Sequence, residues 1–173
     1  MVTMSKILDH DISLPRAWTA NELPDSAGLM ILDDNCRGEL LKIAEILLAN
    51  PLPILSLSTA DFDLPCCKTL MTAVSEQLDH GPGFAIVDRL PLGSLNTHIA
   101  TSLYWLLASM IERPVAQSWE GKLLYDVRDT GKRPGNGVRP DITSAGQNLH
   151  TDNSYNLCPP DYVALLCINT AMK

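Results

Sequence analysis

The order of its hydrophobic patterns constrains this chain most: helical periodicity dominates about the first 110 residues, and strand-like runs follow later. Apolar residues recur at the spacing of one buried helix face in residues 34–50, 65–78 and 95–111. Short apolar runs typical of strands, the first of them predicted to be buried, occupy residues 84–87, 122–127 and 162–168. Helices that precede strands in this way predict an α+β fold.

Local signals support the predicted helix ends. Asp33 or Asp34 can accept the unpaired backbone N–H groups at the start of the first helix, and Pro51 stops it. Pro65 suits the first position of the second helix, and Gly81 begins the turn that ends it. We expect the chain between these helices to be a connector and the chain before them to be irregular.

The charge balance argues against a nucleic-acid partner, because 13 Lys and Arg against 20 Asp and Glu give a net charge of −7. No stretch reaches the roughly 18 apolar residues of a transmembrane helix, and the N-terminus lacks the apolar core of a secretory signal. The five cysteines are an odd number without a CxxC pair. Reduced thiols and a cytoplasmic location are therefore predicted, without a membrane partner.

A histidine and an aspartate follow a long predicted loop. Residues 129–147 hold four glycines and two prolines, and loops of this length are uncommon and often functional. In extended chain, residues i and i+2 point to the same face, so His150 and Asp152 can converge on one ion. Such a pair supplies two of the three ligands of the facial triad in non-haem Fe(II) oxygenases. A surface histidine beside a loop aspartate would show the same spacing.

The sequence around this pair resembles the TauD/TfdA-like dioxygenases, enzymes of the taurine dioxygenase and clavaminate synthase type. The resemblance rests on four segments in family order, GFAIV (83–87), GKLLYDV (121–127), NLHTDNSY (148–155) and PPDYVALLC (159–167). It runs through residues 65–173, and residues 1–64 are predicted to be an irregular or helical extension. We expect residues 1–173 to form a single domain, the N-terminal portion of a dioxygenase domain.

The resemblance implies an enzyme that uses Fe(II), 2-oxoglutarate and O₂ to oxidise a C–H bond of a small molecule. His150 and Asp152 would be the first two iron ligands. The implied fold places helices outside the first part of a double-stranded β-helix (jelly-roll) core, which is incomplete in this chain. The residues that lie where related enzymes contact substrate are Tyr125, Ser144, Gln147 and Asn148.

The resemblance also implies groups that this chain does not contain. The distal histidine ligand, the arginine that binds 2-oxoglutarate and its assisting serine or threonine are expected beyond Lys173. Arg139 precedes the histidine and aspartate pair, so it is not assigned to 2-oxoglutarate. We therefore expect this chain to be inactive alone. The alternative, a non-catalytic fragment or pseudoenzyme that acts as a binding module, stays open at this point.

Overall fold

The structure, a computed structural model, describes residues 9–13, 15–118, 120–135, 137–148, 150–152, 157 and 159–170. It divides into two compact units. The first, here called the helical unit, takes the residues up to Glu112 and those from Leu166 onward. The second, here called the loop unit, is Arg113–Leu165.

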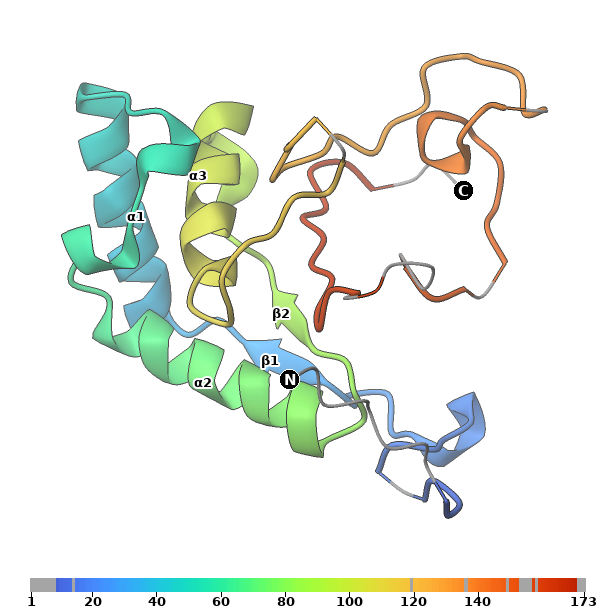
Figure 1. Cartoon of the computed structure of the whole chain (residues 1–173). Coiled ribbons are helices and arrows are strands. Elements are labelled where there is room, and N and C mark those ends of the chain that lie inside the picture. The colour runs from blue at the N-terminus through green and yellow to red at the C-terminus, as the bar shows by residue number, and fades with distance from the viewer. Residues whose placement is uncertain are drawn as a thin grey trace. The chain divides into compact units, whose positions relative to one another are not determined.

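The helical unit contains the helices and strands that Figure 1 labels. The helices are α1 (Asp34–Ala49), α2 (Pro65–His80) and α3 (Thr97–Ala108), and the strands are β1 (Leu29–Ile31) and β2 (Ile86–Asp88). Short 3₁₀ turns occupy Ala20–Glu22, Ile54–Ser56, Thr59–Asp61 and Leu92–Ser94. The three predicted helices are confirmed, with ends that differ from the predicted ones by a few residues.

Side-chain caps explain where two of the helices begin. The Asp33 carboxylate accepts the backbone N–H of Cys36 at 2.8 Å, which satisfies one of the unpaired donors of α1. Asn96 does the same for α3, because its side-chain oxygen accepts the N–H of Ile99 at 3.0 Å. Pro65 occupies the first turn of α2, as the sequence predicted.

The start of α2 is capped by a side chain from α1. The Glu39 carboxylate accepts the backbone N–H groups of Cys66 and Cys67, both at 2.9 Å. Burial raises the pKa of Glu39, but these two hydrogen bonds outweigh it and hold the pKa below its usual value. A negative charge at a helix N-terminus also suits the helix dipole, so Glu39 joins the two helices.

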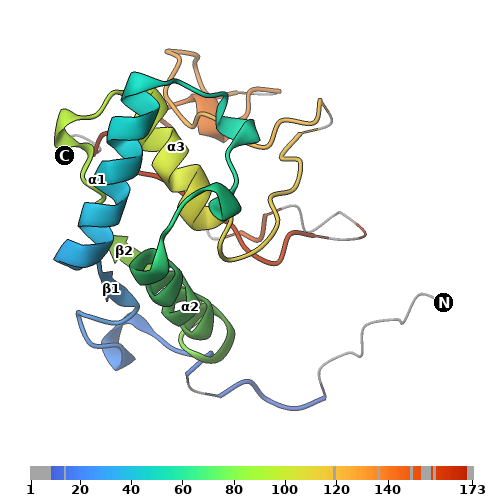
Figure 2. The same cartoon turned by 90° about the vertical axis from the view of Figure 1, so that its left-hand side faces the viewer.

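The core of the unit lies among the three helices, which Figure 2 shows from the side. Its fully buried large apolar side chains are Leu40, Leu47, Leu64, Ile99, Leu103 and Leu106. Each such side chain contributes about 1.5–3 kcal/mol when it leaves water. The Trp105 indole N–H, which is also buried, donates to the Leu57 carbonyl at 3.1 Å. The connector before α2 is thereby fixed to α3.

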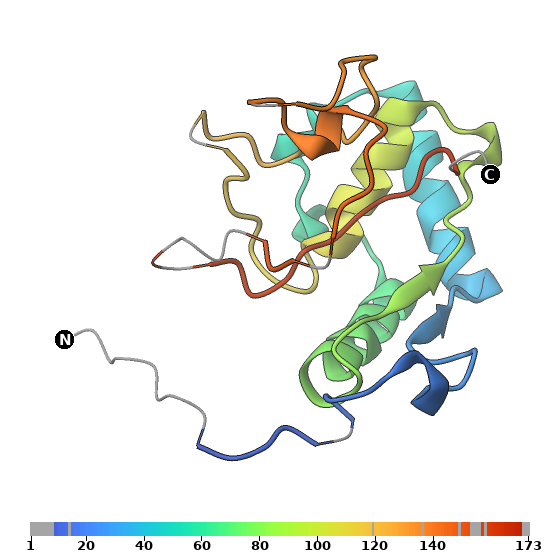
Figure 3. The same cartoon turned by 90° about the vertical axis from the view of Figure 1, so that its right-hand side faces the viewer.

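The two strands form a small parallel sheet, in which Leu29 pairs with Ile86 and Ile31 with Asp88 (Figure 3). β1 lies in a segment that was predicted to be irregular, and that prediction is wrong for these three residues. β2 starts later than the predicted strand, at Ile86. Ile86 is 56% exposed, so the prediction that the run is buried is also wrong. The side chains of Leu29 and Ile31 on β1 are exposed as well.

Two further strand predictions are wrong. Neither residues 122–127 nor residues 162–168 form a strand in the structure. A strand persists only when its backbone groups pair with a neighbour, and no described segment forms a ladder with either run. The side chain of Leu165, for example, is 82% exposed. The described fold is thus a mixture of helix and strand, and the jelly-roll core stays an expectation at the level of the family.

The loop unit has little regular structure. A 3₁₀ turn, Pro140–Ile142, is the regular element among its described residues, and none of those residues is buried. The prediction of a long loop over residues 129–147 is confirmed for the described residues of this range, apart from this turn. Across the described part of the chain, no helix has the length and apolarity needed to cross a membrane.

Candidate functional site

The candidate metal pair lies in the loop unit, and its two side chains face each other. The Nε2 atom of His150 lies 3.3 Å from Oδ1 of Asp152, and the side chains are 49% and 50% exposed. The Nδ1 atom lies 2.8 Å from the backbone carbonyl oxygen of Asn148. Since a carbonyl can only accept, Nδ1 carries a hydrogen and Nε2 is the atom presented to the aspartate.

The surroundings of the imidazole favour its protonated, positively charged form. The hydrogen bond to the Asn148 carbonyl raises the pKa of His150 above its usual value, and the Asp152 carboxylate adds to the effect. When the ring is neutral, the Nε2 lone pair and a carboxylate oxygen point at the same region. Two such electron-pair donors repel each other unless a proton or a cation lies between them.

The donor chemistry of this pair fits a divalent metal ion. Imidazole nitrogen and carboxylate oxygen are the ligands of non-haem iron sites, and metal-binding histidines commonly donate their other N–H to a backbone carbonyl. Within the described residues, no group of three His, Cys, Asp or Glu side chains could hold a metal ion. The described part of the chain therefore supplies two donors. Several motif neighbours, Leu149, Asn153, Ser154 and Tyr155, lie outside the described residues.

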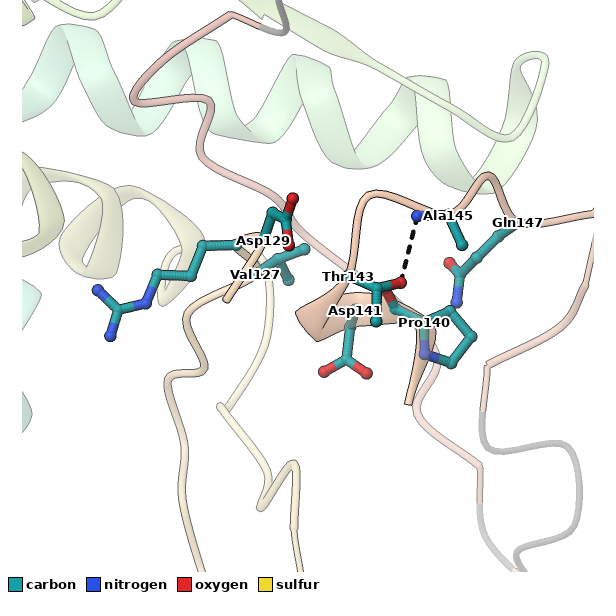
Figure 4. Close-up of a pocket in the computed structure, with 8 residues that line it drawn as sticks. Val127, Asp129, Pro140, Asp141, Thr143, Ala145 and Gln147 are labelled. Carbon is teal, nitrogen blue, oxygen red and sulfur yellow. Dashed lines mark hydrogen bonds between the residues drawn. The ribbon is translucent and has the colours of Figure 1, made fainter. Parts of the chain in front are cut away.

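The predicted substrate-contacting residues have different surroundings. Gln147 lines a hollow of about 210 Å³, shown in Figure 4, together with Val127, Arg128, Asp129, Pro140, Asp141, Thr143 and Ala145. Tyr125 does not line the hollow, and the guanidinium carbon of Arg139 lies 5.1 Å from its ring centroid. Ser144 is exposed. Asn148 is also exposed, and it contributes its backbone carbonyl to His150.

Sequence reasoning missed Asp141, which organises the loop. Its Oδ1 accepts a hydrogen bond from Arg139 Nε at 3.0 Å. Burial raises the pKa of Asp141, but the Arg139 guanidinium and the Tyr125 hydroxyl outweigh it, so the pKa lies below its usual value. Opposite charges two residues apart, around Pro140 in a turn, were the signal that could have indicated this pair.

Comparison with known sequences decides the family. Residues 50–172 match the family described as "Taurine catabolism dioxygenase TauD, TfdA family". The chain belongs to the TauD/TfdA family. The resemblance around His150 and Asp152 is confirmed at this level, and oxygenase-type oxidoreductase chemistry is the function of the family. The match also covers α2, α3 and β2 of the helical unit.

This TauD/TfdA chain is similar in sequence to a curated relative, the FR-33289 synthase of Streptomyces rubellomurinus (strain ATCC 31215). The two sequences are 27% identical over 169 residues, which cover 97% of this chain and 49% of the relative. The chain therefore spans about half the length of the curated relative that it matches.

Proposed function

We propose that this chain is the N-terminal portion of an Fe(II)- and 2-oxoglutarate-dependent dioxygenase that oxidises a C–H bond of a small molecule with O₂. The observation that carries the proposal is the approach of His150 Nε2 and Asp152 Oδ1 to 3.3 Å, with the other ring nitrogen held by a carbonyl. Membership of the TauD/TfdA family supports the same chemistry. The proposal includes the jelly-roll core that the family implies, of which this chain would form the first part.

Within the proposal, the residues of the chain have separate roles. His150 and Asp152 hold the iron, and the Asn148 carbonyl fixes the ring nitrogen that faces it. Bound iron and 2-oxoglutarate supply the oxidising power. The residues proposed to contact and orient substrate are Tyr125, Ser144, Gln147 and Asn148.

We also propose that the third iron ligand and the groups that bind 2-oxoglutarate belong to a longer protein, of which residues 1–173 are part of one domain. This chain alone would then be inactive. The length of the relative, which is about twice the matched segment, supports this proposal. A cytoplasmic location is part of it, supported by the free thiols of Cys36, Cys66, Cys67 and Cys167.

Anaerobic titration with Fe(II) tests the proposed metal pair. We expect weak one-to-one binding by the 173-residue chain, because two ligands hold iron less tightly than three. His150→Ala and Asp152→Ala should each abolish it. His10→Ala is the matched control, since the exposed His10 Nδ1 lies 3.1 Å from Asp9 Oδ1. Binding that survives both site variants would contradict the proposal and favour a non-catalytic binding module.

A longer protein that contains this chain provides the test of the reaction. With Fe(II), 2-oxoglutarate and O₂, it should form succinate, and His150→Ala should remove that activity. Absence of succinate with several candidate substrates would count against the enzyme and for the binding module.

A further inference from the structure

Three side chains of the loop unit form a cluster. The Arg139 guanidinium lies over the ring of Tyr125, 5.1 Å from its centroid, and donates from Nε to Asp141 at 3.0 Å. The Asp141 side chain is 17% exposed, the Arg139 side chain 64%. Arg139 thus joins the Tyr125 ring to the covered Asp141 carboxylate.

The same residues lie where two segments of the loop are joined by hydrogen bonds. The Arg128 N–H donates to the Asp141 carbonyl at 3.2 Å. The N–H and hydroxyl of Thr130 donate to the Ile142 carbonyl at 3.0 and 2.9 Å. No described residue of the loop unit is buried, so apolar packing contributes little to holding this loop. Its shape depends on the cluster and on these backbone hydrogen bonds.

Local hydrogen bonds continue from this turn toward the candidate metal pair. The hydroxyl of Thr143 donates to the Pro140 carbonyl at 2.9 Å, and the Ala145 N–H donates to that hydroxyl at 3.2 Å. Figure 4 shows the second of these contacts beside the hollow. Three residues beyond Ala145, the Asn148 carbonyl accepts from His150. Gly146 and Gln147 alone separate Ala145 from Asn148, so the turn fixes the start of the short segment that contains the carbonyl.

We propose that Arg139, which lies over the Tyr125 ring, and Asp141 are positioning residues for His150. They hold the turn from which the chain runs to the candidate metal pair, and so they set which ring nitrogen the histidine presents. This inference rests on the proposed function, in which His150 is a metal ligand. Arg139, which was not assigned to 2-oxoglutarate, thereby has a role within its own loop.

Nuclear magnetic resonance of the metal-free chain tests the inference, with Arg139→Leu as the variant. Arg133→Leu is the matched control, because the exposed Arg133 lies in the same loop and its loss changes the net charge equally. In Arg139→Leu, the Arg128 and Thr130 amides should exchange with solvent about tenfold faster than in the control. The ¹⁵N shifts of the His150 ring should lose the preference for hydrogen on Nδ1.

Asp141→Asn, which keeps the shape of the side chain, should reproduce both effects. If exchange and ring shifts match the control in both variants, the cluster positions nothing and the inference is wrong. If exchange rises while the ring shifts stay unchanged, the cluster only supports the loop, and the positioning role is overturned as well. These readouts use no metal, so a failed Fe(II) titration would contradict the proposed function and leave them untouched.

Discussion

At the scale of single residues, four carboxylates make contacts that fix helix ends and loop segments in this chain. Glu39 joins α1 to α2 by accepting two backbone N–H groups, and Asp33 caps α1. Asp141 accepts a hydrogen bond from Arg139 in the loop cluster, and Asp152 faces His150. A cap at Asp33 or Asp34 and the approach of Asp152 to His150 were predicted, because capping and i,i+2 spacing are local patterns. The role of Glu39 was not predicted, because the N–H groups that it accepts come from another helix. The pair of Arg139 and Asp141 was missed although its spacing is local.

Glu39→Gln should destabilise the helical unit by about 1–2 kcal/mol, because a neutral amide accepts the two N–H groups less well than a carboxylate does. Urea unfolding followed by helical circular dichroism measures this change. Glu45→Gln, an exposed glutamate on the same helix, is the control and should change stability by less than about 0.5 kcal/mol.

The effect of Glu39 should also depend on pH. Because its pKa is lower in the folded state than the ordinary value of 4.5, its carboxylate adds stability above that value. The added stability is lost as pH falls through the folded pKa. The difference between the wild-type chain and Glu39→Gln should therefore shrink below pH 4.5. A difference that stays constant down to pH 2 would show that charge plays no part in the cap.

At the scale of elements, the helices were predicted better than the strands, of which only β2 was predicted, with other ends. The periodicity of α1, α2 and α3 and their caps are local, so one stretch of sequence contains the whole signal. β1 has three residues and pairs with β2, which lies beyond two helices, so no local pattern indicated it. The run at residues 162–168 has the composition of a strand, but pairing decides whether a strand forms.

The contrast between α3 and residues 162–168 gives a prediction. Leu103→Ala should cost about 2–5 kcal/mol, since Leu103 is fully buried in the helical core. Leu165→Ala should cost less than about 0.5 kcal/mol in this chain, since the Leu165 side chain is 82% exposed. Thermal or urea unfolding of both variants checks the pair. A large loss in Leu165→Ala would show that this segment is packed in solution.

At the scale of the whole molecule, apolar burial is uneven. The buried side chains of the described residues all lie in the helical unit, between Leu32 and Leu107. The loop unit, which holds His150 and Asp152, depends on polar contacts and turns. Stability in proteins varies locally in this way, and segments with few buried contacts open most easily. The candidate site therefore lies in the less stable of the two units.

Limited proteolysis should reveal this difference. Trypsin should cleave after Lys122, Arg128 and Lys132 in the loop unit at least about tenfold faster than after the lysines of α1 and α2. Lys42 and Lys68 serve as internal controls, because their side chains are exposed while their backbones are helical. Mass spectrometry of a time course identifies the sites. Equal cleavage rates in both units would contradict the inference that the loop unit is less stable than the helical unit.

We propose that His150 and Asp152 aim at one point where a divalent cation binds. Titration of the ¹⁵N-labelled chain with paramagnetic Mn²⁺ tests this proposal, because bound Mn²⁺ broadens the signals nearest to it. Broadening should begin at Asn148, His150 and Asp152, at concentrations that leave Asp9 and His10 sharp. Broadening that starts at the Asp9 and His10 pair, or spreads evenly over the acidic surface, would contradict the proposal.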